Sequence, residues 1–246
     1  MLGDSITYGT DSTGTVGFRR ALFQSLEATH GVDSFEFVGS QTDGSPDDFD
    51  RDHEGHSGWH ANQIRDNITG WLNSTPADII ALHIGTNDIS GGQDAAGIAG
   101  EIGEILDNID VWEAANHPVT VVLARIINRS NPTSDDGQET TALNGAIQTL
   151  ADARIASGDQ IVVVDMEPAL DYPADMDDSV HPNDSGYSKM APVYDAAIDP
   201  LLAAFSSPSV DNVVLSPDPA DVAEDLSCAF DLTGDTSATV WSVDAS

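Results

Sequence analysis

The sequence predicts an α/β fold in which helices cover both faces of a parallel sheet. Short β-prone runs alternate along the chain with stretches whose apolar residues recur at helical spacing. The β-prone runs are mostly apolar. With 246 residues, 40% of them apolar, the chain can bury one sizeable core. We therefore expect one main domain and a small appendage.

Four β-prone runs are predicted as strands, and a fifth precedes Ser5, where only Met1 to Gly3 remain of it. The four runs are Phe35 to Gly39 (FEFVG), Asp78 to Ile84 (DIIALHI), Val119 to Ala124 (VTVVLA) and Ile161 to Asp165 (IVVVD). Apolar side chains at helical spacing predict helices between them. The helical sets begin at Phe18, Ile64, Ile98 and Leu143. A last helix is expected from about residue 184 to 205, bent or restricted by Pro192.

The character of the sequence changes at Ser206. Prolines, turn residues and short β-prone runs follow to the end of the chain. This composition predicts a catalytic or binding domain over residues 1–205, and a linker with a partial β-type segment over residues 206–246. Because the strand before Ser5 is so short, we expect the run Val210 to Ser216 to dock against it, within one molecule or exchanged between two in a dimer.

Charge limits the partners of this protein. It has 42 acidic and 8 basic residues, a formal net charge of -34. Such a charge excludes unassisted binding to nucleic acid or to an anionic membrane, and favours a salt-rich, marine or halophilic source in which repulsion is screened. The single cysteine, Cys228, allows no disulfide within the chain. No apolar run approaches the roughly 20 residues of a membrane span. We expect a secreted protein whose signal is not in this chain, with a cytoplasmic one as the alternative.

Four short stretches carry the chemistry. They are GDSIT (Gly3 to Thr7), HEGHSGW (His53 to Trp59), HIGTND (His83 to Asp88) and DSVHPND (Asp178 to Asp184). In this order, each near the carboxyl end of a predicted strand, they resemble the four blocks of the SGNH (GDSL-type) hydrolases. HEGHSGW, LHIGTND and HPNDSGYSKMA further resemble acetylxylan esterases of carbohydrate esterase family three. The resemblance implies a flavodoxin-like fold with five parallel strands in the order 2-1-3-4-5, and no cofactor.

The resemblance assigns roles that agree with the chemistry of the residues. Ser5 would be the nucleophile, and a serine hydroxyl needs a base within hydrogen-bond reach. His181 would be that base, and Asp178 would accept from its other ring nitrogen. Asp177 is the alternative acid if the loop turns differently.

Three donors are implied for the oxyanion hole: the backbone N–H groups of Ser5 and Gly58 and the side-chain amide of Asn87. A glycine at position 58 would let the backbone approach the substrate closely. Trp59 could wall the acyl pocket or stack on a sugar, or it could only pack.

Two acidic or histidine-rich stretches invite a metal interpretation. His53, His56 and His60 could ligate zinc, but they lie in an apparent loop and not on one helical face, so we expect no metal there. The run SPDDFDRDHE lacks the spacing of a calcium loop and is interpreted as a solvated charge run.

The sequence therefore predicts a serine esterase that removes acetyl groups from a plant or algal polysaccharide. A lipid-type esterase or thioesterase on the same fold is one alternative. A non-catalytic carbohydrate-binding or adhesion module is the other, because a fold alone does not prove an activity.

Overall fold

A computed structural model describes residues 1–31, 33–206, 209–216 and 227–233. Its centre is a five-stranded parallel sheet in the order β2-β1-β3-β4-β5, which confirms the predicted architecture and strand order. The strands are β1 (Leu2–Gly3), β2 (Glu54–Gly55), β3 (Ile79–His83), β4 (Thr120–Arg125) and β5 (Ile161–Asp165).

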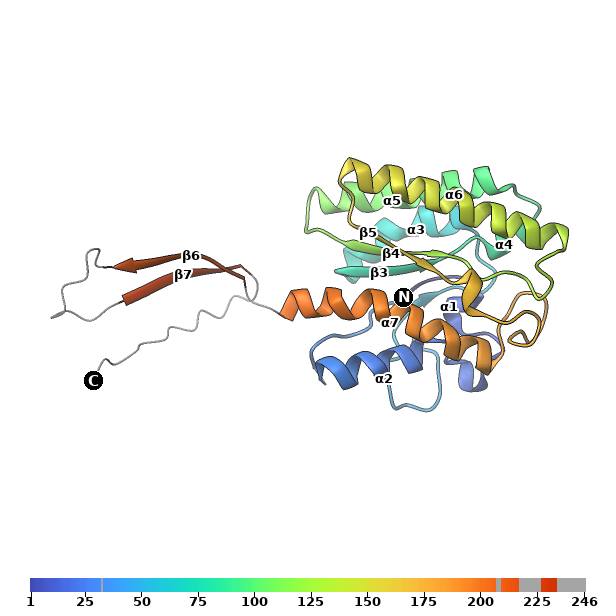
Figure 1. Ribbon diagram of the computed structural model, residues 1–246, viewed down its shortest axis with the longest axis horizontal. Helices are drawn as coiled ribbons and strands as arrows, with labels where there is room; N and C mark the ends of the chain where they lie inside the picture. Colours follow the sequence, from blue (N-terminus) through green and yellow to red (C-terminus); the bar gives the residue numbers. More distant parts are fainter. Residues whose placement is uncertain (32, 207–208, 217–226, 234–246) are drawn as a thin grey trace. The chain divides into compact units, whose positions relative to one another are not determined.

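Helices cover both faces of this sheet (Figure 1). α3, α5 and α6 lie on one face, and α2 and α7 lie on the other. The α-helices are α1 (Ser5–Tyr8), α2 (Arg19–His30), α3 (Ala61–Ser74), α4 (Thr86–Ser90), α5 (Ala95–Glu113), α6 (Asp135–Ser157) and α7 (Asp184–Ser206), and two 3₁₀ turns span Thr13–Thr15 and Glu167–Ala169. α7 continues through Pro192.

The helical periodicity of the sequence corresponds to the buried faces. On α5, Ile98, Ile102, Ile105 and Ile109 are all buried, and they pack in one core with Ile64 of α3 and other apolar residues. Each such side chain stabilises the fold by about 1.5–3 kcal/mol when it is fully buried. These faces hold α3, α5 and α6 against the sheet and so fix the loops at its carboxyl edge.

The strand predicted at Phe35 to Gly39 is wrong. This stretch is irregular, and the edge position of the sheet is taken by Glu54–Gly55 instead. The backbone N–H of Phe37 donates to Asp50 Oδ2 (2.9 Å), a carboxylate and not a neighbouring strand. The aromatic content that suggested a strand serves packing instead, because the rings of Phe35 and Phe37 each lie 5.2 Å from that of Phe23.

Arg19 is fully buried at the start of α2 and joins several loops next to the sheet. Its guanidinium donates hydrogen bonds of 2.9–3.1 Å to the backbone carbonyls of Thr7, Tyr8, Thr15, Asp43 and Arg51. Burial lowers the pKa of Arg19 to about 10, so that it still carries its charge near neutral pH. One side chain therefore holds together the segment after α1 and the long connection between α2 and β2.

The chain divides into two units, Met1–Asp199 and Pro200–Ser246. In the second, β6 (Ser209–Ser216) pairs antiparallel with β7 (Ser227–Thr233), with an irregularity between Asp211 and Val214. β6 includes the whole run expected to dock against β1, and in this sheet its partner is β7. Docking of that run on the first unit, and the domain boundary at residue 205, stay predictions.

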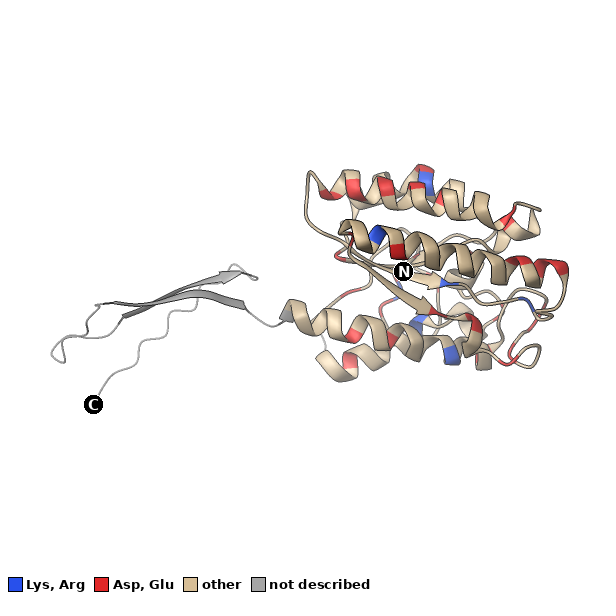
Figure 2. Ribbon diagram, turned by 45° about the horizontal axis from the view of Figure 1, so that its top comes forward, with Lys and Arg blue, Asp and Glu red and all other residues tan. Residues whose placement is uncertain are grey.

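Acidic residues are spread over the surface of the first unit. Figure 2 shows them along the solvent-facing helices, with few basic positions among them. Several of the basic residues pair with more than one acid, as Arg154 does with Asp107 and Asp110. None of the helices in the described part of the chain is both long enough and apolar enough to cross a bilayer.

Candidate active site

Ser5 lies where the interior strand β1 turns directly into the short helix α1. This turn needs Gly3, because a Cβ there would lie 2.2 Å from the carbonyl oxygen of His83 on β3. Asp4 caps the helix, and its Oδ1 accepts a hydrogen bond from the backbone N–H of Ile6 (2.9 Å). Burial raises the pKa of Asp4 to about 7. The buried cap fixes the backbone on which the Ser5 hydroxyl is presented.

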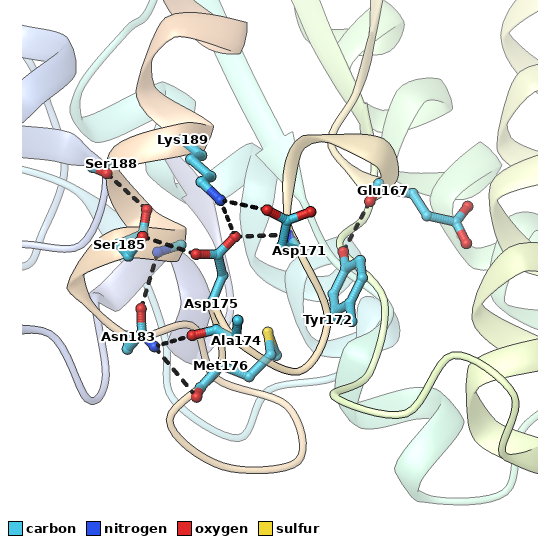
Figure 3. Close-up of polar contacts among 11 residues, drawn as sticks. Glu167, Asp171, Tyr172, Ala174, Asp175, Met176, Asn183, Ser185, Ser188 and Lys189 are labelled. Carbon is cyan, nitrogen blue, oxygen red and sulfur yellow. Dashed lines mark hydrogen bonds and ion pairs between the residues drawn. The ribbon is translucent and has the colours of Figure 1, made fainter.

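The loop before α7 carries His181, and Asp175 anchors it (Figure 3). The buried carboxylate of Asp175 accepts hydrogen bonds from the Ser185 hydroxyl (2.8 Å) and the Asp171 N–H (2.6 Å), and it pairs with Lys189. Asn183 adds a bond to the Ala174 carbonyl (2.9 Å). The segment before His181 is thus attached to Asn183, which precedes α7, and to the first turns of α7.

The structure brings Ser5, His181 and Asp178 into one hydrogen-bonded line. Ser5 Oγ lies 2.9 Å from His181 Nε2, and His181 Nδ1 lies 2.9 Å from Asp178 Oδ2. Asp178 Oδ1 also accepts the backbone N–H groups of Val180 and His181, both at 2.7 Å. Burial alone would raise the pKa of Asp178, but these hydrogen bonds outweigh it and lower that pKa below its ordinary value. Asp178 is therefore ionised and can orient the imidazole.

The alternative acid, Asp177, faces solvent, and its backbone N–H donates to the carbonyl of His181 (2.9 Å). Asp11 is a neighbour that the sequence analysis missed. Its Oδ2 lies 3.3 Å from His181 Nδ1, and its backbone has a φ of +65°. The turn-rich stretch around Asp11 contains no motif that marks it.

Asp11, Asp178 and His181 also form the one group in the described residues whose ligand atoms lie close enough to hold a metal ion, within 4.8 Å of one another. A cation bound to His181 Nδ1 would replace the proton on that nitrogen and so remove the hydrogen bond to Asp178. The distance of 2.9 Å between Nδ1 and Asp178 Oδ2 fits this hydrogen bond.

The turn that contains Gly58 lies beyond the carboxyl end of β2. Trp59 N–H donates to the His56 carbonyl (3.1 Å), and Gly58 has a φ of +81°, the value of the third position in a type II turn. A Cβ at Gly58 would meet nothing within 4 Å, so open space lies beside it. The Asn87 amide, on α4, donates to the Trp59 carbonyl (2.9 Å) and thereby holds this turn. One of its two N–H groups is used in this bond, and the other can serve a ligand.

Trp59 is partly buried and stacks on other rings of the protein. Its ring lies 4.2 Å from that of His56 and 5.8 Å from that of Trp71. Packing is thus one function of Trp59; a sugar-binding function stays a prediction.

The histidines that suggested zinc have separate partners. His53 is buried, and its Nδ1 accepts from the Gly55 N–H (3.0 Å); burial lowers its pKa to about 3. His56 pairs with Glu54 (2.7 Å), and His60 lies 3.5 Å from Asp88. The carboxylate of Asp88 in turn accepts from the Ala61 N–H (3.0 Å) at the start of α3. Asp4 and Asp88 thus hold the loops at this edge.

Arg129 is a second residue that the sequence did not indicate, and unlike Asp11 it is buried. It donates to the Thr86 carbonyl (2.7 Å), and burial lowers its pKa although Asp136, Asp4 and Asp178 act in the opposite direction. Its guanidinium therefore supports the segment before Asn87 and adds positive charge near Asp4 and Asp178.

Comparison with known proteins identifies a family. Residues 1–189 match the model of the GDSL-like Lipase/Acylhydrolase family. A multidomain esterase of Ruminococcus flavefaciens is 28% identical over 228 residues, which cover 84% of this chain and 29% of that protein. The chain therefore spans less than a third of the length of this curated relative.

Solved structures of esterases have the same fold. A carbohydrate esterase family 3 protein from Talaromyces cellulolyticus is 33% identical with a TM-score of 0.70, over 82% of this chain and 96% of that one. A family 3 carbohydrate esterase of Clostridium thermocellum is 28% identical with a TM-score of 0.71, over 84% and 96%. An acetyl esterase mutant bound to an acetate ion is 32% identical with a TM-score of 0.71, over 83% and 97%. With the match of the family model, these similarities show that the chain is an esterase domain that belongs to the GDSL-like lipase/acylhydrolase family and is similar to carbohydrate esterases of family 3.

Proposed function

We propose that this domain is a serine esterase that removes acetyl groups from a carbohydrate, acetylated xylan or a related polysaccharide. The observation that carries the proposal is the hydrogen-bonded line of Ser5, His181 and Asp178 at the carboxyl edge of the sheet. The similarity to an acetyl esterase and to two family 3 carbohydrate esterases supports the substrate class.

In the proposed reaction, Ser5 Oγ attacks the carbonyl carbon of the acetyl ester while His181 Nε2 accepts the hydroxyl proton. Asp178 holds the Nδ1 proton and stabilises the imidazolium that forms. His181 then returns the proton to the leaving sugar oxygen, which leaves an acetyl-enzyme on Ser5. A water molecule, deprotonated by His181, attacks this ester and releases acetate.

The oxyanion that forms in both steps would be bound by the backbone N–H groups of Ser5 and Gly58 and by the free N–H of the Asn87 amide. Gly58 is exposed with open space beside it, as a donor to a ligand must be. Asn87 already donates to Trp59, so its amide is held in one orientation before a substrate arrives. Donors that are oriented in advance lower the barrier without reorganisation during the reaction.

A polymeric substrate cannot cross a membrane, and we therefore place the reaction outside the cell. The net charge of -34 supports a neutral polysaccharide as the substrate, because carboxylates on the enzyme repel those of an anionic polymer at low salt.

Acetate release from a panel of acetylated polysaccharides, at low and high salt, tests the proposal. Wild-type protein should release acetate from acetylated xylan or a related polymer, and Ser5→Ala should release none while its melting temperature is unchanged. A series of p-nitrophenyl esters should show rates that fall beyond acetyl or propionyl. Higher rates on long chains would instead identify a lipid-type esterase, because each methylene in apolar contact contributes about 0.8 kcal/mol.

An organophosphonate that labels active serines distinguishes the enzyme from a binding module. It should add one adduct to the wild-type protein and none to Ser5→Ala, as measured by mass spectrometry. A wild-type protein without an adduct would contradict the proposal.

A further inference from the structure

Glu54 and His56 lie next to the candidate oxyanion turn, and the reaction proposed above does not use them. His56 Nε2 lies 2.7 Å from Glu54 Oε1, and both side chains are largely buried. His56 also begins the turn that contains Gly58, since its carbonyl accepts from the Trp59 N–H. His56 thus belongs both to a buried acid–imidazole pair and to the turn.

The carboxylate of Glu54 accepts hydrogen bonds at both of its oxygens. Its Oε2 accepts the backbone N–H of Ser40 (2.7 Å), and its Oε1 accepts the hydroxyl of the same residue (2.6 Å). Burial alone would raise the pKa of Glu54, but the hydrogen bonds from His56 and Ser40 outweigh it and lower that pKa below its ordinary value. The acid is therefore an ionised, fixed acceptor for the imidazole.

The imidazole is fixed on its faces as well as at its edge. The ring of His56 lies 4.2 Å from that of Trp59 with an interplanar angle of 21°, and 5.0 Å from that of Trp71 with an angle of 9°. His56 and Trp59 are the first and last residues of the turn, and Trp71 is on α3. The two ends of the turn are therefore stacked on each other and on the helix behind them.

Gly58 has no comparable attachment of its own. It has no side chain, and nothing lies within 4 Å of the position of a Cβ. The direction of its backbone N–H thus depends on the residues at the ends of the turn. At one end the main chain is fixed by the His56 N–H, which donates to the Gly3 carbonyl (2.9 Å) two residues before Ser5. At the other end Asn87 holds the carbonyl of Trp59.

We propose that His56, oriented by Glu54, is a positioning residue for the oxyanion hole. Its ring holds the turn of residues 56–59 in the shape that presents the Gly58 N–H to the developing oxyanion. The inference depends on the proposed serine esterase reaction. It goes beyond that reaction by assigning a role to Glu54 and His56, which take no part in its chemical steps.

The test uses His56→Phe, which keeps a flat ring for stacking but cannot bond to Glu54. We expect kcat on p-nitrophenyl acetate to fall at least about tenfold with KM changed less than about twofold, because an interaction made in the transition state is lost. His30→Phe is the matched control. His30 pairs with Asp199 (3.0 Å) far from Ser5 in the sequence and outside the four blocks, and its replacement should leave kcat unchanged.

A transition-state analogue separates positioning from simple structural support. Methylboronic acid forms a tetrahedral adduct with an active serine, and its inhibition constant should rise in His56→Phe by the same factor as kcat/KM falls. In a double-mutant cycle with Asn87→Ala, the two losses should be less than additive, since both act on one turn. Should His56→Phe not fold, His56→Gln, which can bond to Glu54 but has no ring, should give the same pattern.

A folded variant with wild-type kcat and boronate affinity would overturn the inference, and so would full additivity with Asn87→Ala. Neither result would affect the proposed function, which depends on wild-type acetate release and on its loss in Ser5→Ala.

Discussion

His181 and Asp178 are joined twice, once through the imidazole and once through the main chain. Asp178 Oδ2 lies 2.9 Å from His181 Nδ1, and Asp178 Oδ1 accepts the backbone N–H of His181 at 2.7 Å. The carboxylate thus fixes both the ring and the backbone from which the ring extends. Asp178 and His181 thus form one hydrogen-bonded unit within a single loop.

Asp178→Asn should therefore lower kcat by about 10²- to 10⁴-fold, because an amide facing Nδ1 favours the wrong tautomer of the imidazole. Asp177→Asn is the control one residue away, and it should keep near wild-type activity because Asp177 contacts His181 through its backbone N–H, which the substitution keeps. Steady-state kinetics on p-nitrophenyl acetate compare the two. Greater damage from Asp177→Asn would transfer the acid's role to that residue.

Asn87→Ala should lower kcat about a hundredfold or more with little change in KM, the pattern expected when an oxyanion donor is removed. Asn67→Ala serves as its control, because the Asn67 amide donates to a carbonyl within α3 (2.8 Å). A raised KM with normal kcat would instead make Asn87 a substrate-binding residue.

Asp4→Asn should stabilise the protein above neutral pH. The pKa of Asp4 is raised by burial from 3.8 to about 7, so the unfolded chain ionises first and wild-type stability falls as pH rises from about 4 to 7. The cost reaches the order of 4 kcal/mol, at about 1.4 kcal/mol for each pKa unit. Asparagine caps helices as well as aspartate and has no charge to bury.

Thermal melts from pH 4 to pH 8 measure this effect. The gain in melting temperature from Asp4→Asn should be small at pH 4, grow up to pH 7 and stay constant above it. A difference between the two proteins that does not vary with pH would contradict the buried ionisation of Asp4.

Added salt should raise the melting temperature. With 42 acidic and 8 basic residues, the dominant long-range electrostatic interaction is repulsion among carboxylates. Salt screens this repulsion, because the Debye length falls from about 10 Å at 0.1 M to about 3 Å at 1 M salt. Melts in 0.1 to 2 M sodium chloride test this. A flat profile would remove the argument for a salt-rich habitat.

Deletion of residues 207–246 tests whether the tail completes the core fold. If Val210 to Ser216 docks against β1, the shortened protein should lose several degrees of melting temperature or become insoluble. Gel filtration of the full chain then distinguishes docking within one molecule from exchange in a dimer. Unchanged stability and activity after the deletion would show that the tail is dispensable.

The sequence was most informative where one signal dominated. Ile98, Ile102, Ile105 and Ile109 predicted α5 because burial alone determines that face. The buried runs of β3 and β4 were found for the same reason, and so was the apolar run of β5, of which Ile161 and Val164 are buried. The Phe35 to Gly39 strand failed because aromatic residues suit both strands and irregular packing, and only the tertiary structure shows that Phe23 covers them.

The candidate site, too, could be predicted from the sequence only in part. Motifs indicated Ser5, His181 and Asp178, since these residues stand in the stretches that resemble the SGNH blocks, and the structure brings the three side chains together. They could not locate Asp11 or Arg129, whose proximity to the site depends on loop paths and burial and not on local spacing. The sequence also left the partners of Trp59 open, because stacking on His56 and Trp71 depends on how the turn meets α3.

Arg19 gives the loops beside Ser5 a permanent organic cation around which backbone carbonyls gather, as they do around a bound calcium ion. Unlike an ion, it is tethered to the chain and cannot be chelated or diluted away. In a protein so rich in carboxylates, this cation is bonded to neutral carbonyls and shielded from solvent. High salt weakens the surface ion pairs, but it should leave the architecture around Ser5 intact. The rigidity of this edge of the sheet should therefore not depend on the ionic strength of its surroundings.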